Sequence, residues 1–239
     1  LIMKRLRSKL KNLAVMALAL CLFCALSIGN AEQRFDADAF MTSINGTYGA
    51  LFSVITQPEY DSVWLERCTE YAGEEDAQAA MDYLTTVCCG DVYGEEAVKA
   101  YSDAPESAQF YCGFLGGVAR LTFDNGTISG VDADGSEVYS HKYAYVGDSE
   151  QMGFHLYKTD DADAGAFTYF AMRDDTPEST YHLEFRYGDD VEALDNYVEG
   201  KYAYWMAAGF SADYDDDLVY KVIDLFCEEN LTAADDAQE

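Results

Sequence analysis

The sequence predicts an α+β protein, mainly β, built as an antiparallel β-barrel or meander with flanking helices. Two observations carry this prediction. Short segments rich in β-branched and aromatic residues recur through residues 108–187, with turn residues between them. Helical periodicity occupies residues 60–101 before this region and 189–229 after it. No linker or internal repeat divides the chain, so residues 32–239 are expected to form a single domain.

The central region contains six strand-like segments. Asn125-Gly126 and Asp134-Gly135 fall between neighbouring segments and are typical of tight hairpin turns. Residues 132–137, DADGSE, resemble part of a calcium loop but lack its remaining ligands, so a simple turn is the better interpretation. The segments are VARLTF, TISGV, SEVYSHKYAYV, GFHLYK, AFTYFAMR and YHLEFRY.

The flanking regions have helical patterns with acidic residues near their starts, as the helix dipole favours. In the last pattern, residues 216–229, the apolar side chains fall on one face. Residues 41–56 combine an Asn-Gly turn with an apolar run that fits either a strand or the start of a helix. The helical patterns are SVWLERCTEYA, DAQAAMDYLTTVCC, EEAVKAYS, DVEALDNYVEG and DDLVYKVIDLFCEE.

Residues 1–31 have the layout of a secretory signal peptide. A basic segment precedes an apolar run, and Gly29 and Ala31 occupy the −3 and −1 positions of a cleavage site. We expect cleavage after Ala31 and an exported protein, whether periplasmic, at the cell surface or secreted. A retained membrane anchor is the alternative, although the apolar run is slightly short of the roughly 20 residues that span a bilayer.

The chain is strongly acidic. Its formal net charge is −29, and the leader holds five of the 15 basic residues and none of the 44 acidic residues. Without the leader, 10 basic and 44 acidic residues leave a net charge of −34. Such a surface repels nucleic acid and anionic lipid and attracts cations, so nucleic-acid partners are excluded.

Five cysteines follow the leader, and their connectivity is open from the sequence. If the compartment is oxidising, we expect at least one disulfide that joins a helical segment to the barrel, because closing a long loop stabilises the fold by roughly 3 to 4 kcal/mol. The adjacent cysteines Cys88 and Cys89 have no second cysteine pair at zinc-ribbon spacing, which argues against a cysteine metal site. The five are Cys68, Cys88, Cys89, Cys112 and Cys227.

No pattern in the chain combines a nucleophile with a base, and phosphate-loop and zinc-protease motifs are absent, so an enzyme is not predicted. His141 and His155 lie in strand-like segments, where packing is the expected role. In the stretch TYHLEFRYGDD, residues 180–190, His182 and Glu184 are two positions apart and share one face of a strand. By spacing alone, this short pattern marks an ordinary strand histidine more often than a metal ligand.

Three segments of the chain resemble the ZinT (YodA) family of exported zinc- and cadmium-binding proteins. In the first segment Gly46 and Tyr48 hold the family's glycine and aromatic positions at the entry of a lipocalin-type barrel. The resemblance implies a lipocalin-like (calycin) β-barrel with added helices, and makes residues 32–239 one ZinT-like domain. The segments are INGTYGALFSVI with the later YDSVW, the run GFHLYKTDDADAGAFTYFAMRDDTPESTYHLEFRYGDD, and the helical end from Asp189 to Glu229.

The resemblance also locates a metal site and shows how this chain departs from it. The family has a histidine and, nine positions later, His-x-His; here those positions hold Arg173, His182 and Glu184. Glutamate can bind zinc, whereas a guanidinium cannot. Two outcomes follow. Arg173 pairs with Glu184 in an ion pair worth about 1 kcal/mol if it is exposed, which makes the site structural. Alternatively, Arg173 turns to solvent, and His182 and Glu184 join Asp174 or another nearby carboxylate to bind metal weakly.

The expected geometry is specific. His182 and Glu184 are predicted to face the barrel interior, with Leu183 and Phe185 on the other face. Arg173 is predicted to approach the pair from across the turn DDTPEST.

The function that the resemblance implies is capture or trafficking of a divalent metal outside the cytoplasm. Zinc is the expected ion, with cadmium or another divalent metal able to substitute. A zinc-uptake transporter binding protein is an implied partner, and the chain is expected to be a monomer. The alternative is a degenerate barrel that binds a small apolar ligand or a protein partner without metal.

Overall fold

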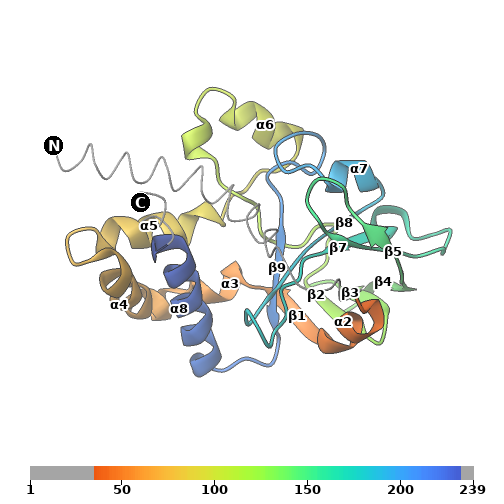
Figure 1. Cartoon of the computed structure of the whole chain (residues 1–239), viewed down its shortest axis with the longest axis horizontal. Coiled ribbons are helices and arrows are strands. Elements are labelled where there is room, and N and C mark those ends of the chain that lie inside the picture. Colours follow the sequence, from red (N-terminus) through yellow and green to blue (C-terminus); the bar gives the residue numbers. More distant parts are fainter. Residues whose placement is uncertain (1–34, 233–239) are drawn as a thin grey trace.

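The computed structural model describes residues 35–232, so the predicted signal peptide and its membrane-anchor alternative lie outside the described residues. Within this range the strands form one antiparallel sheet in the order β4-β3-β2-β1-β9-β8-β7-β6-β5, curled into a nearly closed barrel (Figure 1). The predicted fold class, a mainly β α+β barrel with flanking helices, is therefore confirmed. The strands are β1 (Gly46–Ala50), β2 (Arg120–Asp124), β3 (Thr127–Val131), β4 (Glu137–Lys142), β5 (Ala144–Asp148), β6 (His155–Lys158), β7 (Tyr169–Met172), β8 (Leu183–Gly188) and β9 (Ala207–Ser211).

The longer helices gather on one side of the barrel, where α4, α5 and α8 pack beside one another (Figure 1). Trp64 on α4 is fully buried there, and its Nε1 donates a hydrogen bond of 2.7 Å to the Ile55 carbonyl. Within residues 35–232 no helix is both long enough and apolar enough to cross a membrane. The helices are α2 (Ala37–Ser43), α3 (Phe52–Ile55), α4 (Asp61–Ala72), α5 (Ala77–Val87), α6 (Glu95–Tyr101), α7 (Val191–Leu194) and α8 (Asp216–Thr232), with 3-10 turns η1 (Pro58–Tyr60), η2 (Pro105–Ser107) and η3 (Gly165–Phe167).

The Asn-Gly hairpin predicted between the first two central segments is confirmed. Asn125 and Gly126 have φ values of 48° and 85°, and β2 pairs with β3 in register from Arg120↔Val131 to Asp124↔Thr127. Both central residues of this turn are left-handed, as a type I′ hairpin requires, and only asparagine and glycine adopt that conformation readily.

The barrel is larger than the predicted core of residues 108–187. Strand β1 precedes that range, and β9 lies inside residues 189–229, which were predicted to be helical. Strand β9 connects the two halves of the sheet, because it pairs with β1 at Tyr48↔Ser211 and with β8 at Glu184↔Ala208. The sequence of β9, AAGFS, is rich in small residues, and its buried position in the sheet overrides its weak strand propensity.

The helical pattern predicted over residues 190–200 forms only the short helix α7. Arg186, a fully buried residue of β8, takes the carbonyl groups that a longer helix would use. Its Nη1 donates to the carbonyls of Leu194 and Asn196 at 2.5 and 2.9 Å, and its Nη2 donates to the carbonyl of Tyr202. The loop after α7 is thus folded around a guanidinium group that no local pattern reveals.

The structure differs from the expected disulfide between a helix and the barrel. Cys68 on α4 and Cys227 on α8 are buried thiols whose Sγ atoms lie 3.9 Å apart. This contact joins two helices of the same layer.

Candidate metal-binding site

Strand β8 positions Glu184 on the outside of the barrel, which corrects the predicted orientation, and His182 lies directly before the strand. Leu183 and Phe185 are fully buried, and the Phe185 ring lies 5.9 Å from Phe123 on β2, across the barrel. Since successive residues of a strand point to opposite faces, Glu184 faces outward. The predicted orientation was wrong because aromatic rings fill the barrel, so Leu183 and Phe185 take the inner face and Glu184 the outer one.

The imidazole of His182 is held by the backbone just before it. Its Nδ1 lies 2.7 Å from the Thr180 carbonyl oxygen, which can only accept a hydrogen bond, so Nδ1 carries a proton. Tyr181 between them has a left-handed φ of 61°, which turns the chain so that this carbonyl reaches the ring. The other nitrogen, Nε2, is directed at Glu184, 3.8 Å from Oε1.

Arg173 approaches the pair from the preceding strand, as predicted. Its backbone N–H donates to the Glu184 carbonyl at 3.0 Å, and its Nε lies 3.9 Å from Glu184 Oε2. Its guanidinium also lies over the Phe154 ring, 5.6 Å from the centroid. The side chains of Arg173 and Glu184 are 11% and 28% exposed, so the contact is an ion pair partly shielded from water.

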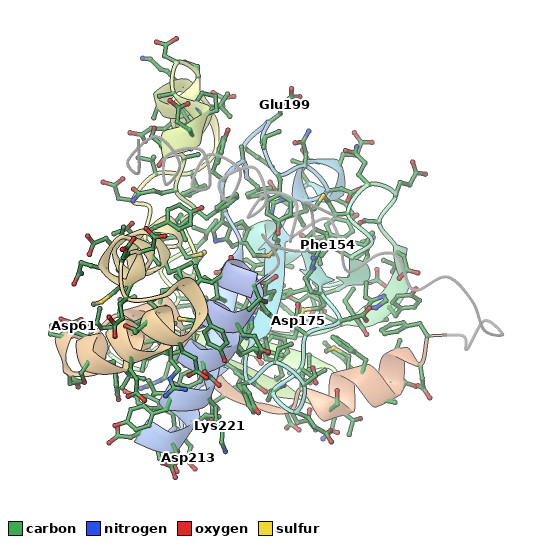
Figure 2. All side chains as sticks on the ribbon, turned by 60° about the vertical axis from the view of Figure 1, so that its left-hand side comes forward. Asp61, Phe154, Asp175, Glu199, Asp213 and Lys221 are labelled. Carbon is green, nitrogen blue, oxygen red and sulfur yellow. The ribbon has the colours of Figure 1, made fainter. Side chains whose placement is uncertain are left out.

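Two further carboxylates belong to this group and were not predicted. Burial and the repulsion of Glu184 raise the pKa of Asp175 to about 6. The pKa of Glu229 on α8 is also raised, because its carboxyl loses solvent and because Asp175 and Glu184 repel it. Figure 2 shows Asp175 beside α8. Asp175 could have been predicted from the sequence, because it follows the candidate ligand Asp174. Glu229 could not, because it comes close only through the packing of α8.

The pKa values of His182 and Glu184 are shifted in opposite directions. Burial disfavours the charged imidazole of His182, but Glu184, Asp175 and the Thr180 carbonyl outweigh it and raise its pKa. Burial likewise disfavours the Glu184 carboxylate, but His182 and Arg173 outweigh it and lower its pKa. The charged imidazole and the carboxylate thus favour each other, and a metal ion would compete with a proton for Nε2.

Asp174 is engaged elsewhere. Its Oδ1 lies 2.6 Å from His155 Nε2, while His155 Nδ1 lies 2.7 Å from Asp148 Oδ1. Burial disfavours charge on His155, but the two carboxylates outweigh it and raise its pKa. The ring is stacked on Phe35 with centroids 3.5 Å apart. The structure thus brings together His182 and Glu184 of the predicted set and places Asp174 against another histidine.

His141 is buried on β4, in keeping with the predicted packing role. Its Nδ1 lies 2.9 Å from Asp161 Oδ2, and its ring is stacked on Tyr139 with centroids 5.8 Å apart. Both nitrogens of His155 and one of His141 already have carboxylate partners, which leaves His182 as the histidine with a backbone-fixed tautomer.

Chemically, the group contains the His182 imidazole, the carboxylates of Glu184, Asp175 and Glu229, and the Arg173 guanidinium beside Glu184. Imidazole and carboxylate are the ligands that zinc accepts in proteins. In the part of the chain that the structure describes, no three histidine, cysteine or acidic side chains are already placed to hold a metal ion together. His182 and Glu184 are two candidate ligands from the predicted set that lie side by side.

The inside of the barrel has a different character. The Phe170 ring lies 6.1 Å from Phe185, 5.1 Å from Tyr187 and 6.2 Å from Phe123, so rings from β2, β7 and β8 pack on one another. Close aromatic packing of this kind is typical of a filled protein core. It does not favour the alternative in which the barrel holds a small apolar ligand.

Comparison with known proteins gives structural matches only. No family model matches the chain, and no curated protein matches it. The crystal structure of the Zn(II)-bound ZinT-like domain of Streptococcus pneumoniae AdcA is similar, with a TM-score of 0.47 and 16% identity over 82% of this chain and 94% of that domain. The Zn(II)-bound AdcA from Streptococcus pneumoniae is similar with a TM-score of 0.44 and 14% identity, over 82% of this chain and 40% of AdcA.

Proposed function

We propose that the protein binds a divalent metal ion, zinc first, through His182, directly before β8, and Glu184 on the outer face of that strand. One observation carries the proposal. The Thr180 carbonyl fixes the proton on Nδ1 of His182, so the neutral ring presents the Nε2 lone pair toward the Glu184 carboxylate. Metal-binding histidines are oriented in the same way, with one nitrogen bonded to a carbonyl or carboxylate and the other on the metal.

The third ligand in this proposal is Asp175. Burial raises its pKa most and repulsion from Glu184 raises it further, and a dication between the two carboxylates would relieve that repulsion. Asp174, the third ligand expected from the sequence, would first have to leave His155. Glu229 on α8 is a further carboxylate close to the same charges.

Arg173 sets the strength of the site. A guanidinium cannot bind metal, and its positive charge 3.9 Å from Glu184 opposes a second cation there. Binding therefore requires Arg173 to turn away, which weakens the affinity relative to a site with three histidines. An oxygen-rich ligand set is also less selective for zinc, so cadmium or another divalent ion can substitute.

The role that fits such a site is capture or trafficking of zinc outside the cytoplasm, by a monomeric binding protein rather than an enzyme. The signal peptide predicted over residues 1–31 and the resemblance to the ZinT family support this part of the proposal. A zinc-uptake transporter binding protein is the partner that the resemblance implies.

Calorimetric zinc titration at fixed pH tests the site. We expect His182→Ala and Glu184→Gln to lose affinity by about tenfold or more, because each removes a ligand. Arg173→His should bind more tightly than the unmodified protein, because it removes a cation and adds an imidazole.

Asp213→Asn is the matched control for Glu184→Gln. Each substitution removes one carboxylate, but Asp213 is exposed and lies before the start of α8, away from Asp175 (Figure 2). An equal loss in both variants would mean that zinc responds only to the general acidity of the chain. Identical titrations for all four variants and the unmodified protein would refute the proposed site.

A further inference from the structure

The helical layer contains a pair of cysteines in direct contact. Cys68 on α4 and Cys227 on α8 are both fully buried, and their Sγ atoms lie 3.9 Å apart although 159 positions separate them in the chain. Two sulfur atoms at this distance touch, with no other atom between them.

Polar and aromatic contacts between neighbouring residues also join α4 to α8. The Tyr71 hydroxyl donates to Asp224 Oδ1 at 3.0 Å, and Arg67 Nη1 lies 3.5 Å from the same oxygen. The Phe226 ring meets the Trp64 ring edge-on, with centroids 6.0 Å apart. The approach of the two thiols is therefore part of a tightly packed helix interface.

We propose that Cys68 and Cys227 form a disulfide bond that joins α4 to α8 in the exported protein. Closing the gap to a bond of about 2.05 Å needs rotation of two side chains, while the helices stay where the surrounding contacts hold them. The bond would connect α4 to α8, the first and last long helices among residues 35–232, and so close a loop that contains every strand described there except β1.

The chemistry requires an external disulfide as oxidant, either a small molecule such as oxidised glutathione or a disulfide-exchange protein. One cysteine thiolate attacks the external disulfide, which forms a mixed disulfide and releases one thiolate. The second cysteine then attacks the protein sulfur of the mixed disulfide, forming the Cys68–Cys227 bond and releasing the second thiolate. The two protons lost by the cysteines are taken up by the two released thiolates. Because both sulfurs are fully buried in the folded chain, the exchange takes place before α8 has packed.

Peptide mapping identifies the bond without any substitution. The full chain is reduced, unfolded, refolded with oxidised and reduced glutathione, alkylated, and cleaved after arginine, lysine and glutamate. Cleavage after Arg67, Glu70, Lys221 and Glu228 releases CTE from α4 and VIDLFCE from α8. We expect these two peptides as one linked species that separates on reduction. Alkylated Cys68 and Cys227 in the refolded protein, or either one linked to another cysteine, would overturn the proposal.

Thermal unfolding with and without reductant gives a second readout. The unmodified protein should lose roughly 5 to 10 °C in Tm when reductant is added. Cys89→Ala, at an exposed cysteine, should keep this loss, and Cys68→Ala should remove it. A reductant effect of equal size in Cys68→Ala would contradict the proposal.

Discussion

The ring of His182 illustrates how a few local contacts define the candidate site. Its Nδ1 is bonded to the Thr180 carbonyl, and its Nε2 is directed at Glu184. His155, by contrast, is bonded to a carboxylate at both nitrogens. Histidines of one chain thus differ in what they can bind, and the difference comes from the backbone turn at Tyr181 rather than from the residue type.

Asp175 provides a prediction at this scale. Its pKa is raised from 3.8 to about 6, so the folded state favours the protonated form. A raised pKa contributes stability below pH 4 and loses that contribution as the pH rises through 6. Asp175→Asn should therefore increase the free energy of unfolding at pH 8 by about 1 to 2 kcal/mol, and by less at pH 5.

Urea unfolding at pH 5 and pH 8 measures the free energy of unfolding of Asp175→Asn, with Asp174→Asn as the matched control. His155 lowers the pKa of Asp174, so the charged Asp174 stabilises the folded state and its removal should destabilise the protein at pH 8. If both variants gain or both lose stability at pH 8, the opposite effects predicted for Asp175 and Asp174 are contradicted.

Individual elements differ in how well the sequence predicts them. The helices α4 and α8 and the β2–β3 hairpin were predicted because local periodicity and turn residues specify them. Strand β9 was missed because its small residues become a strand only between β1 and β8.

The candidate site shows the same limit. The spacing of His182 and Glu184 predicted one shared face of a strand. Which face that is depends on how the aromatic core fills the barrel. Glu229 comes close to the pair only through the packing of α8.

Arg186 gives a prediction at the scale of an element. Its guanidinium donates to three carbonyls of the loop after α7. Arg186→Met should lower the free energy of unfolding by roughly 3 to 5 kcal/mol, because it leaves buried carbonyls without donors. Arg186→Lys should restore little, since an ammonium group cannot reach all three.

Urea unfolding and hydrogen exchange over residues 190–206 test the predicted loss of stability in the Arg186 variants. Arg120→Met, at an exposed arginine of β2, is the control. Equal losses for Arg186→Met and Arg120→Met would contradict the role given to the buried guanidinium.

The whole molecule combines one continuous core with a strongly acidic chain. The barrel interior and the helical layer belong to one cluster of buried side chains, so the described residues form one packing unit. The formal net charge of −29 at pH 7 opposes compaction, because like charges repel one another across the surface.

Salt should therefore stabilise this protein at neutral pH. We expect the Tm at pH 7.5 to rise by several degrees between 20 mM and 500 mM sodium chloride, since screening reduces the repulsion. The same change at pH 4.5, near the sequence pI of about 4.1, should have little effect. A salt effect of equal size at both pH values would exclude charge repulsion as its cause.

The proposed metal site is tested most directly by diffraction from crystals grown with zinc, with data collected on both sides of the zinc absorption edge. We predict an anomalous peak about 2.0 to 2.1 Å from His182 Nε2, with a Glu184 oxygen at a similar distance and the Arg173 side chain turned away. A zinc peak at His141 or His155 with His182 still directed at Glu184, or crystals with no zinc near β8, would contradict the proposed site.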